Sequence, residues 1–267
     1  MAPHNEIVIA FDLYGTLLST ESIAAELATH FGEEKAQAVA ALWRRFQLEY
    51  TWRMNSMSKS TPRSPIPKIL SSVPLDIYKP FSDITRASLQ HALSESSMTL
   101  SGENVASLMK AYDSLGTFPD VAPGLQAIAS DPSISAYVFS NGTDCMVTSS
   151  IKSSPSLSPH AAIFKDLVTV EEIGVFKPNA RVYEYLAKKV GKENHIGGVW
   201  LVSGNPFDVV GARAVGMQAA WVDRGGKGWT DRLGTLTPGG GPTIVVDGVE
   251  GAVEGIKKWA EKKGAEM

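Results

Sequence analysis

The sequence predicts an α/β protein in which a parallel sheet carries a helical segment inserted after the first strand. Short, continuous apolar runs of the kind that form buried parallel strands occur at 7–11, 136–140, 198–202, 219–222 and 243–246. From about residue 121 onward, helical patterns alternate with such runs, which is typical of a parallel sheet covered on both faces. Between residue 20 and about residue 115 the strand-like runs disappear and helical periodicity replaces them.

The first strand, expected over 7–11, ends at Asp12, and Gly15 and Thr16 follow closely. A carboxylate at the C-terminal end of the first strand lies where open α/β sheets bind their ligands. Asp12 is therefore a candidate functional residue. The alternative is structural, because an Asp before Gly and Thr is also common in turns and at helix starts.

The inserted segment is expected to form helices over 23–31, 35–50, 81–94 and 103–115. Ser101 is expected to cap the last of these helices, because acidic and amide residues follow it in the first turn. A stretch rich in Ser and Pro at 54–67 is predicted to be a loop. The expected organisation is a core domain of residues 1–19 and 119–267 and a helical domain of residues 20–118.

Beyond the insertion, a further strand is expected over 167–170, and helices over 125–130, 180–190 and 249–263. Loops are expected at 152–159 and at 236–242, where Gly and Pro cluster. These segments complete the alternation of strand and helix that a parallel sheet requires.

Composition limits the classes of function. The 267 residues include 25 Lys and Arg and 28 Asp and Glu, a formal net charge of −3, so the chain lacks the basic character expected of a nucleic-acid binder. Cys145 is the single cysteine, which excludes an intramolecular disulfide and favours a reducing, cytoplasmic location. No run of 18 apolar residues occurs, so we expect no membrane span, and we expect no signal peptide.

Polar side chains follow four of the expected strands or the segments after them. Because parallel strands place their C-terminal ends on one edge of a sheet, we expect these clusters to meet in one crevice. The clusters are Asp12 to Thr16, Ser140-Asn141, Lys177, and Ser203 to Asp208.

These four clusters resemble the four motifs of the haloacid dehalogenase superfamily. Their order and spacing match, and together they span nearly the whole chain. The matching segments are FDLYGTL at 11–17, SNG at 140–142, KP at 177–178 and SGNPFD at 203–208. The resemblance implies a Rossmann-like core with an inserted helical cap domain and an active site in the cleft between them.

Two positions that differ from the phosphatases of this superfamily narrow the resemblance to one branch. Phosphatases of this superfamily carry a second Asp two residues after the nucleophile as general acid, and here that position is Tyr14. They also bind Mg²⁺ through acids in the fourth motif, and here Asn205 stands where an acid would help, so we expect no metal and no other cofactor. Expulsion of a halide needs neither group. The segment ALWRRFQLEYTW at 41–52 resembles the cap signature of the type II L-2-haloacid dehalogenase branch.

The resemblance implies hydrolysis of an (S)-2-haloacid to the (R)-2-hydroxy acid and halide, without a metal. Asp12 would attack C2 and form an ester, and water would then hydrolyse that ester. Arg44 would stabilise the departing halide, Thr16 would position Asp12, and Asp208 is the favoured base for the water. The implied catalytic set is Asp12, Thr16, Arg44, Lys177, Ser203, Asn205 and Asp208.

The implied partners are a small halogenated carboxylic acid and water. Lys177, Ser140 and backbone amides near Leu13 and Asn141 would hold the substrate carboxylate. The remaining expected pocket residues are Tyr14, Leu48, Phe81, Tyr183 and Phe207. Dimers are common in the family, so a homodimer is allowed, but nothing in the sequence indicates an interface.

Alternatives of function stay open at this stage: the chain could be a phosphatase or another hydrolase of the superfamily, or a noncatalytic protein that binds a small carboxylate. The role of Arg45, where the family often has Gln, is also open. Arg45 either faces solvent and pairs with an acid or alters the pocket.

Overall fold

The computed structural model describes residues 6–58 and 77–265. Its centre is a six-stranded sheet with the strand order β3-β2-β1-β4-β5-β6, and every neighbouring pair is parallel. This architecture confirms the predicted α/β class. The strands are β1 (Ile7–Asp12), β2 (Ile134–Ser140), β3 (Phe164–Thr169), β4 (Val199–Ser203), β5 (Gln218–Val222) and β6 (Ile244–Val246).

Strand β1 lies at the point where the strand order reverses. The chain adds β2 and β3 on one side of β1 and then β4, β5 and β6 on the other. The side chains of β1 and β4 are almost all buried, because both strands are covered on two faces. A crevice opens beyond the carboxyl ends of strands at such a reversal, and it is there that Asp12 and Ser203 end their strands.

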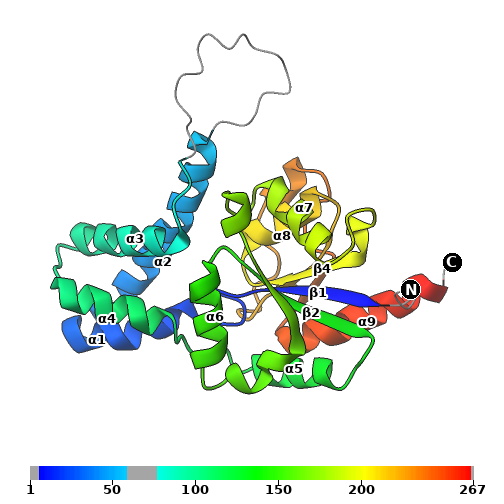
Figure 1. The fold of residues 1–267 in the computed structure, drawn as a ribbon, viewed down its shortest axis with the longest axis horizontal. Helices are drawn as coiled ribbons and strands as arrows, with labels where there is room; N and C mark the ends of the chain where they lie inside the picture. Colours follow the sequence, from blue (N-terminus) through cyan, green and yellow to red (C-terminus); the bar gives the residue numbers. More distant parts are fainter. Residues whose placement is uncertain (1–5, 59–76, 266–267) are drawn as a thin grey trace, which may run out of the picture.

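Helices cover both faces of the sheet (Figure 1). In the view of Figure 1, α5 and α9 lie below the strands and pack against each other, and α7 and α8 lie above. The bounds of the helices after the insertion are α5 (Val121–Ala129), α6 (Asp144–Ser153), α7 (Ala180–Lys189), α8 (Pro206–Ala214) and α9 (Val249–Ala265).

Between β1 and α5 the described chain is helical, and these inserted helices form a layer to one side of the sheet (Figure 1). Helix α2 packs against both α1 and α3. We propose that these helices belong to a domain of residues 20–118, as the sequence predicts. Their bounds are the short helix η1 (Thr20–Ile23), α1 (Ala24–Phe31), α2 (Glu33–Met57), α3 (Phe81–Glu95) and α4 (Gly102–Tyr112).

Several boundaries differ from the sequence predictions. Helix α2 continues to Met57, so the prediction of a loop is wrong for residues 54–57, where neither Gly nor Pro interrupts the helix, and residues 59–67 lie outside the described part. Helix α5 begins at Val121 rather than at 125, because Pro123 is tolerated in a first helical turn. Strand β3 begins at Phe164 rather than at 167. The predicted cap is confirmed: the Asn104 N–H donates to Ser101 Oγ at 3.2 Å.

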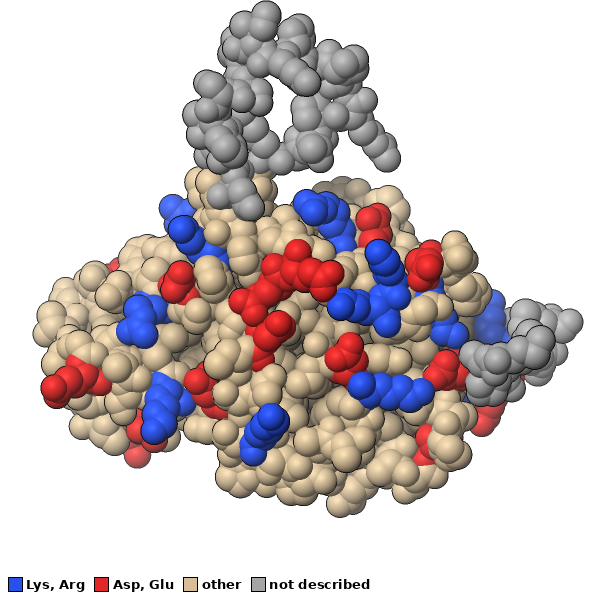
Figure 2. Space-filling model, in the orientation of Figure 1, with Lys and Arg blue, Asp and Glu red and all other residues tan. Residues whose placement is uncertain are grey.

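The surface agrees with the balanced composition. Figure 2 shows Lys and Arg interspersed with Asp and Glu over the visible face. Within residues 6–58 and 77–265, no helix is both long enough and apolar enough to cross a membrane.

Candidate active site

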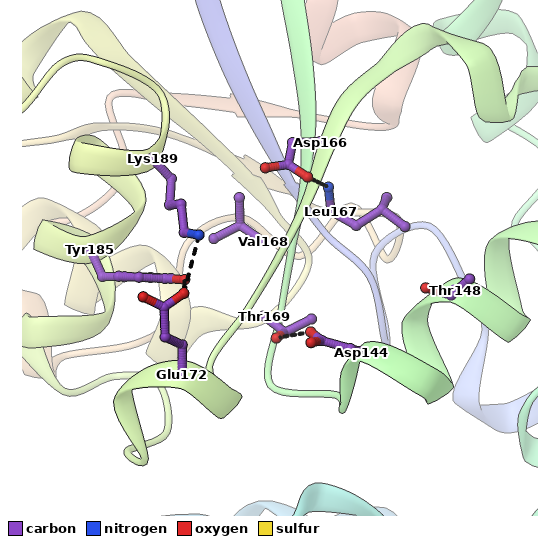
Figure 3. Close-up of a pocket in the computed structure, with 9 residues that line it drawn as sticks. All are labelled: Asp144, Thr148, Asp166, Leu167, Val168, Thr169, Glu172, Tyr185 and Lys189. Carbon is purple, nitrogen blue, oxygen red and sulfur yellow. Dashed lines mark hydrogen bonds and ion pairs between the residues drawn. The ribbon is translucent and has the colours of Figure 1, made fainter.

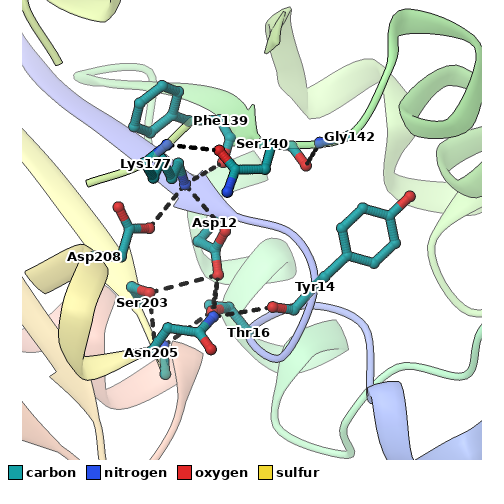
Figure 4. Close-up of polar contacts among 12 residues, drawn as sticks. Asp12, Tyr14, Thr16, Phe139, Ser140, Gly142, Lys177, Ser203, Asn205 and Asp208 are labelled. Atoms are coloured by element: carbon teal, nitrogen blue, oxygen red, sulfur yellow. Dashed lines mark hydrogen bonds and ion pairs between the residues drawn. The ribbon is translucent and has the colours of Figure 1, made fainter. Parts of the chain in front are cut away.

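Asp12 lies at the end of β1 with its carboxylate held from several sides (Figure 4). Its Oδ2 accepts a hydrogen bond from Thr16 Oγ1 at 2.8 Å and another from Asn205 Nδ2 at 2.7 Å. Ser203 Oγ lies 3.5 Å from the same oxygen. Three side chains from two loops therefore converge on one oxygen of a carboxylate that is only 6% exposed.

The ammonium group of Lys177 lies between two carboxylates. Its Nζ is 3.0 Å from Asp12 Oδ1 and 2.7 Å from Asp208 Oδ2, and it also donates to the Phe139 carbonyl oxygen at 2.8 Å. Lys177 and Asp208 are fully buried. One buried cation thus serves two carboxylates, which leaves a net negative charge that the surrounding hydrogen-bond donors must stabilise.

Asp208 is the carboxyl group with the most perturbed environment in the site. Burial raises the pKa of Asp208 to about 6; Lys177 opposes the rise, and the Asp12 carboxylate adds to it. The Tyr183 hydroxyl donates to Asp208 Oδ1 at 2.7 Å and also favours the charged form. Burial raises the pKa of Tyr183 well above its ordinary value, so this hydroxyl stays a donor. A buried acid with a pKa near neutrality is suited to exchange protons with a reacting group.

The loops after β1 and β4 touch at two glycines. Gly15 adopts a positive φ of 86°, and the Gly204 backbone approaches so closely that a Cβ there would lie 2.6 Å from the Gly15 carbonyl oxygen. This approach lets the Gly204 N–H donate to Thr16 Oγ1 at 2.9 Å, while Thr16 in turn donates to Asp12. The backbone of one loop therefore fixes the hydroxyl that positions Asp12.

Arg44 reaches the site from helix α2. Its Nη2 donates to the Tyr14 carbonyl oxygen at 3.0 Å and to Asn205 Oδ1 at 3.3 Å, and its Nη1 donates to Gln47 Oε1 at 2.8 Å. Arg44 thereby joins the inserted helices to both loops that hold Asp12. It also fixes the Asn205 amide so that its nitrogen faces the carboxylate.

Sequence reasoning missed a buried polar network behind Arg44. Gln47 is fully buried, accepts from the Tyr112 hydroxyl at 3.1 Å and donates to Thr85 Oγ1 at 2.8 Å. Trp43 Nε1 donates to the Thr85 carbonyl oxygen at 2.8 Å. The helical spacing of Gln47 three residues after Arg44 was the available signal, because such residues share a face.

The aromatic side chains predicted to wall the pocket form two groups. The Tyr14 ring points away from Asp12 (Figure 4) and lies 5.9 Å from Phe81 and 5.5 Å from Tyr112, measured between ring centroids. Phe207, next to Asp208, packs edge-on against Trp52 of α2 at 5.4 Å. Leu48 is half-buried on α2, one turn after Arg44.

The second motif shapes the turn beyond β2. Ser140 Oγ accepts the Gly142 N–H at 3.0 Å, and Asn141 Oδ1 accepts the Lys177 N–H at 2.9 Å. Leu13 is fully buried. The structure therefore brings Ser140 and Asn141 next to the lysine segment, as the strand ends predict.

Arg45 lies on the surface, which decides between its two alternatives. Its side chain is 63% exposed and its Nη2 lies 3.9 Å from Glu95 Oε1. It therefore faces solvent and pairs with an acid, and the pocket is not altered by it.

Two hollows flank this region. A cleft of about 720 Å³ leads to Arg44 and is lined by Thr20, Glu21, Ala24, Gln37, Ala40 and Ala41. A pocket of about 390 Å³ lies against edge strand β3 (Figure 3) and contains none of the predicted site residues. Four of its polar side chains form two pairs: Thr169 donates to Asp144 at 2.5 Å, and Tyr185 donates to Glu172 at 2.6 Å.

Comparisons with known proteins agree with this fold. An (S)-2-haloacid dehalogenase from Pseudomonas fluorescens is 29% identical over 216 residues, which cover 80% of this chain and 83% of that protein. One from Pseudomonas putida is 29% identical over 218 residues, 81% of this chain and 84% of the relative. A solved L-2-haloacid dehalogenase superposes with a TM-score of 0.78 at 24% identity, covering 95% of this chain and 99% of the other, which shows a shared fold.

The chain has an α/β core with a buried carboxylate–lysine cluster at the carboxyl end of its central strand. The model of the haloacid dehalogenase-like hydrolases matches residues 8–216, and the chain belongs to this family.

Proposed function

We propose that the protein hydrolyses an (S)-2-haloacid to the (R)-2-hydroxy acid and halide, with Asp12 as nucleophile and without a metal ion. The observation that carries the proposal is the environment of Asp12. Asn205 presents an N–H to its carboxylate, and Lys177 presents an ammonium group. The curated (S)-2-haloacid dehalogenases at 29% identity support the substrate class.

In the first step, Asp12 Oδ1 attacks C2 of the substrate from the side opposite the halogen. Among the described residues Oδ1 accepts a hydrogen bond from Lys177 only, whereas Oδ2 is committed to Thr16 and Asn205. The C2–halogen bond breaks, the halide leaves with its electron pair, and the configuration at C2 inverts. Arg44, the one cation from α2 in the network, stabilises the departing anion.

In the second step, water attacks Cγ of the Asp12 ester. Oδ2 is then the ester carbonyl oxygen, and the donors Thr16 and Asn205 stabilise the negative charge that develops on it. Asp208 takes a proton from the water. The Cγ–Oδ1 bond breaks, and the leaving oxygen, the former Oδ1, takes that proton from Asp208 and becomes the product hydroxyl. The water oxygen stays on the Asp12 carboxyl group, whose remaining proton goes to solvent.

The side chains around Asp12 do not favour phosphatase activity. Tyr14 offers no carboxyl group to protonate a leaving oxygen, and burial raises the pKa of its hydroxyl above the ordinary value. Within the described residues no three His, Cys, Asp or Glu side chains are grouped so that they could hold a metal ion. The Asn205 amide turns its nitrogen rather than its oxygen toward Asp12.

Halide release from separate L- and D-2-chloropropionate, with EDTA present, tests the proposal. We expect release from the L form only, unaffected by EDTA, and none from Asp12→Asn. Asp83→Asn, an exposed carboxylate on α3, is the matched control and should keep full activity. Release from both enantiomers, release that requires added Mg²⁺, or release by Asp12→Asn would contradict the proposal.

A further inference from the structure

Described side chains of helix α2 form hydrogen bonds with the core at two places that are three turns apart. Arg44 and Asn55 are separated by eleven residues, so they lie on one face of the helix, about 16 Å apart along its axis. Arg44 contacts the loops after β1 and β4, as described above. Asn55 contacts the segment that carries Lys177.

The Asn55 side chain clasps the backbone of Phe176. Its Nδ2 donates to the Phe176 carbonyl oxygen at 2.7 Å, and its Oδ1 accepts the Phe176 N–H at 2.9 Å. The carbonyl also accepts the Asn179 N–H at 3.0 Å. For the Phe176 N–H, Asn55 is the only partner among the described residues. The Phe176 N–H therefore depends on inserted helix α2 for its hydrogen bond.

Phe176 is a core residue seated among inserted residues. Its side chain is fully buried and lies 5.1 Å from Tyr78 and 6.2 Å from Phe81, between ring centroids. Two successive N–H groups are thus taken by asparagine side chains: Phe176 by Asn55 of α2, and Lys177 by Asn141 of the core.

Among the described residues, the ammonium group of Lys177 contacts groups of the core: Asp12, Asp208, and the carbonyl oxygen and ring of Phe139. The inserted helices can reach the lysine by two routes: through Arg44 and Asn205 to Asp12, and through the backbone of Phe176 next to the lysine. We propose that Asn55 is a positioning residue, which places Lys177 between Asp12 and Asp208 by clasping Phe176 while the inserted helices are docked on the core. The catalytic meaning of this placement rests on the proposed function.

The clasp itself is tested without activity, by amide hydrogen exchange followed by NMR. In Asn55→Ala the Phe176 N–H loses its partner, and we expect its exchange to become about tenfold faster. Arg53→Ala is the matched control, because Arg53 lies on the same helix with a side chain 57% exposed and paired with Glu49. It should leave the Phe176 amide unchanged.

Kinetics test the effect on Lys177. In Asn55→Ala we expect kcat for halide release to fall by roughly 10- to 100-fold, because a misplacement of about 1 Å in a reacting group has such effects. The groups facing Asp208 are Lys177, Asp12 and Tyr183, and Lys177 is the one that lowers its pKa most. A displaced lysine should therefore also move the acid limb of kcat to higher pH. Asn55→Asp, which keeps an acceptor for the Phe176 N–H, should recover part of kcat.

The outcomes separate this inference from the proposed function. If the wild-type protein releases no halide, the proposed function fails, while faster Phe176 exchange would still establish the clasp. The inference would be overturned if Asn55→Ala had the same melting temperature as the wild type, the same protection of the Phe176 amide, and an unchanged kcat with an unchanged acid limb in its pH profile. A rise in KM alone, with kcat and the pH profile unchanged, would also overturn it, because that result describes docking of the helices without placement of Lys177.

Discussion

Asp208 lies wholly inside the protein, with Lys177 Nζ at 2.7 Å and the Tyr183 hydroxyl at 2.7 Å. Its folded pKa of about 6 lies above the ordinary value of 3.8, chiefly because of burial. Above pH 6 the group is mostly a carboxylate and can take a proton from water. As the pH falls through about 6 it becomes protonated and loses that ability.

We therefore expect the rate of ester hydrolysis to fall by half near pH 6 and to keep falling below it. Tyr183→Phe removes a hydrogen bond that favours the carboxylate, so the acid limb should move to higher pH. The pH dependence of kcat measures both effects. Tyr185→Phe is the control on the same helix, because the Tyr185 hydroxyl donates to Glu172 instead. An acid limb that stays in place in Tyr183→Phe would show that another group sets it.

At the scale of elements, stability and catalysis are carried by different features of the helices and loops. The N-terminal cap of helix α4 lies away from Asp12; there, Ser101 Oγ accepts a hydrogen bond from the Asn104 N–H. The contact between the loops after β1 and β4 lies next to Asp12, and Gly204 makes this contact by its close approach to the Gly15 carbonyl oxygen.

Ser101→Ala should lower the free energy of unfolding by about 1 kcal/mol, with kcat unchanged. Gly204→Ala should lower it by about 1–3 kcal/mol, since the new Cβ meets backbone, and should also lower kcat because Thr16 is displaced. Denaturant unfolding and halide release measure the two quantities. Equal kcat values for both variants would contradict the assigned role of the loop contact.

The order of the elements explains why much of the candidate site was predictable. Asp12 and Lys177 are 165 residues apart in sequence, yet both follow strands of one parallel sheet, and the structure places them 3.0 Å apart. Gln47 and Asn55 were not predicted, because their partners lie on other segments: helices α3 and α4 for Gln47, and the segment before Lys177 for Asn55. Local sequence carries the helical period of α2 but not the partners that its face will meet.

The boundaries of the helices show the same limit of prediction from local sequence. The Ser- and Pro-rich composition of residues 54–67 indicated a loop, but residues 51–57 contain neither Gly nor Pro and continue α2. This extension matters for the molecule, since it carries Trp52 and Asn55 over the core. The sheet positions the Asp12 carboxylate. Helix α2 connects the inserted layer to the core through Arg44 and Asn55.

The central claim for the whole molecule is that Asp12 forms an ester with the substrate. A single turnover in water enriched in oxygen-18, with enzyme in excess over L-2-chloropropionate, tests it most directly. We expect one labelled oxygen in the peptide that contains Asp12, found by mass spectrometry, and an unlabelled hydroxyl group in the product. A labelled product with an unlabelled Asp12 peptide would mean that water attacks C2 directly and that Asp12 forms no ester.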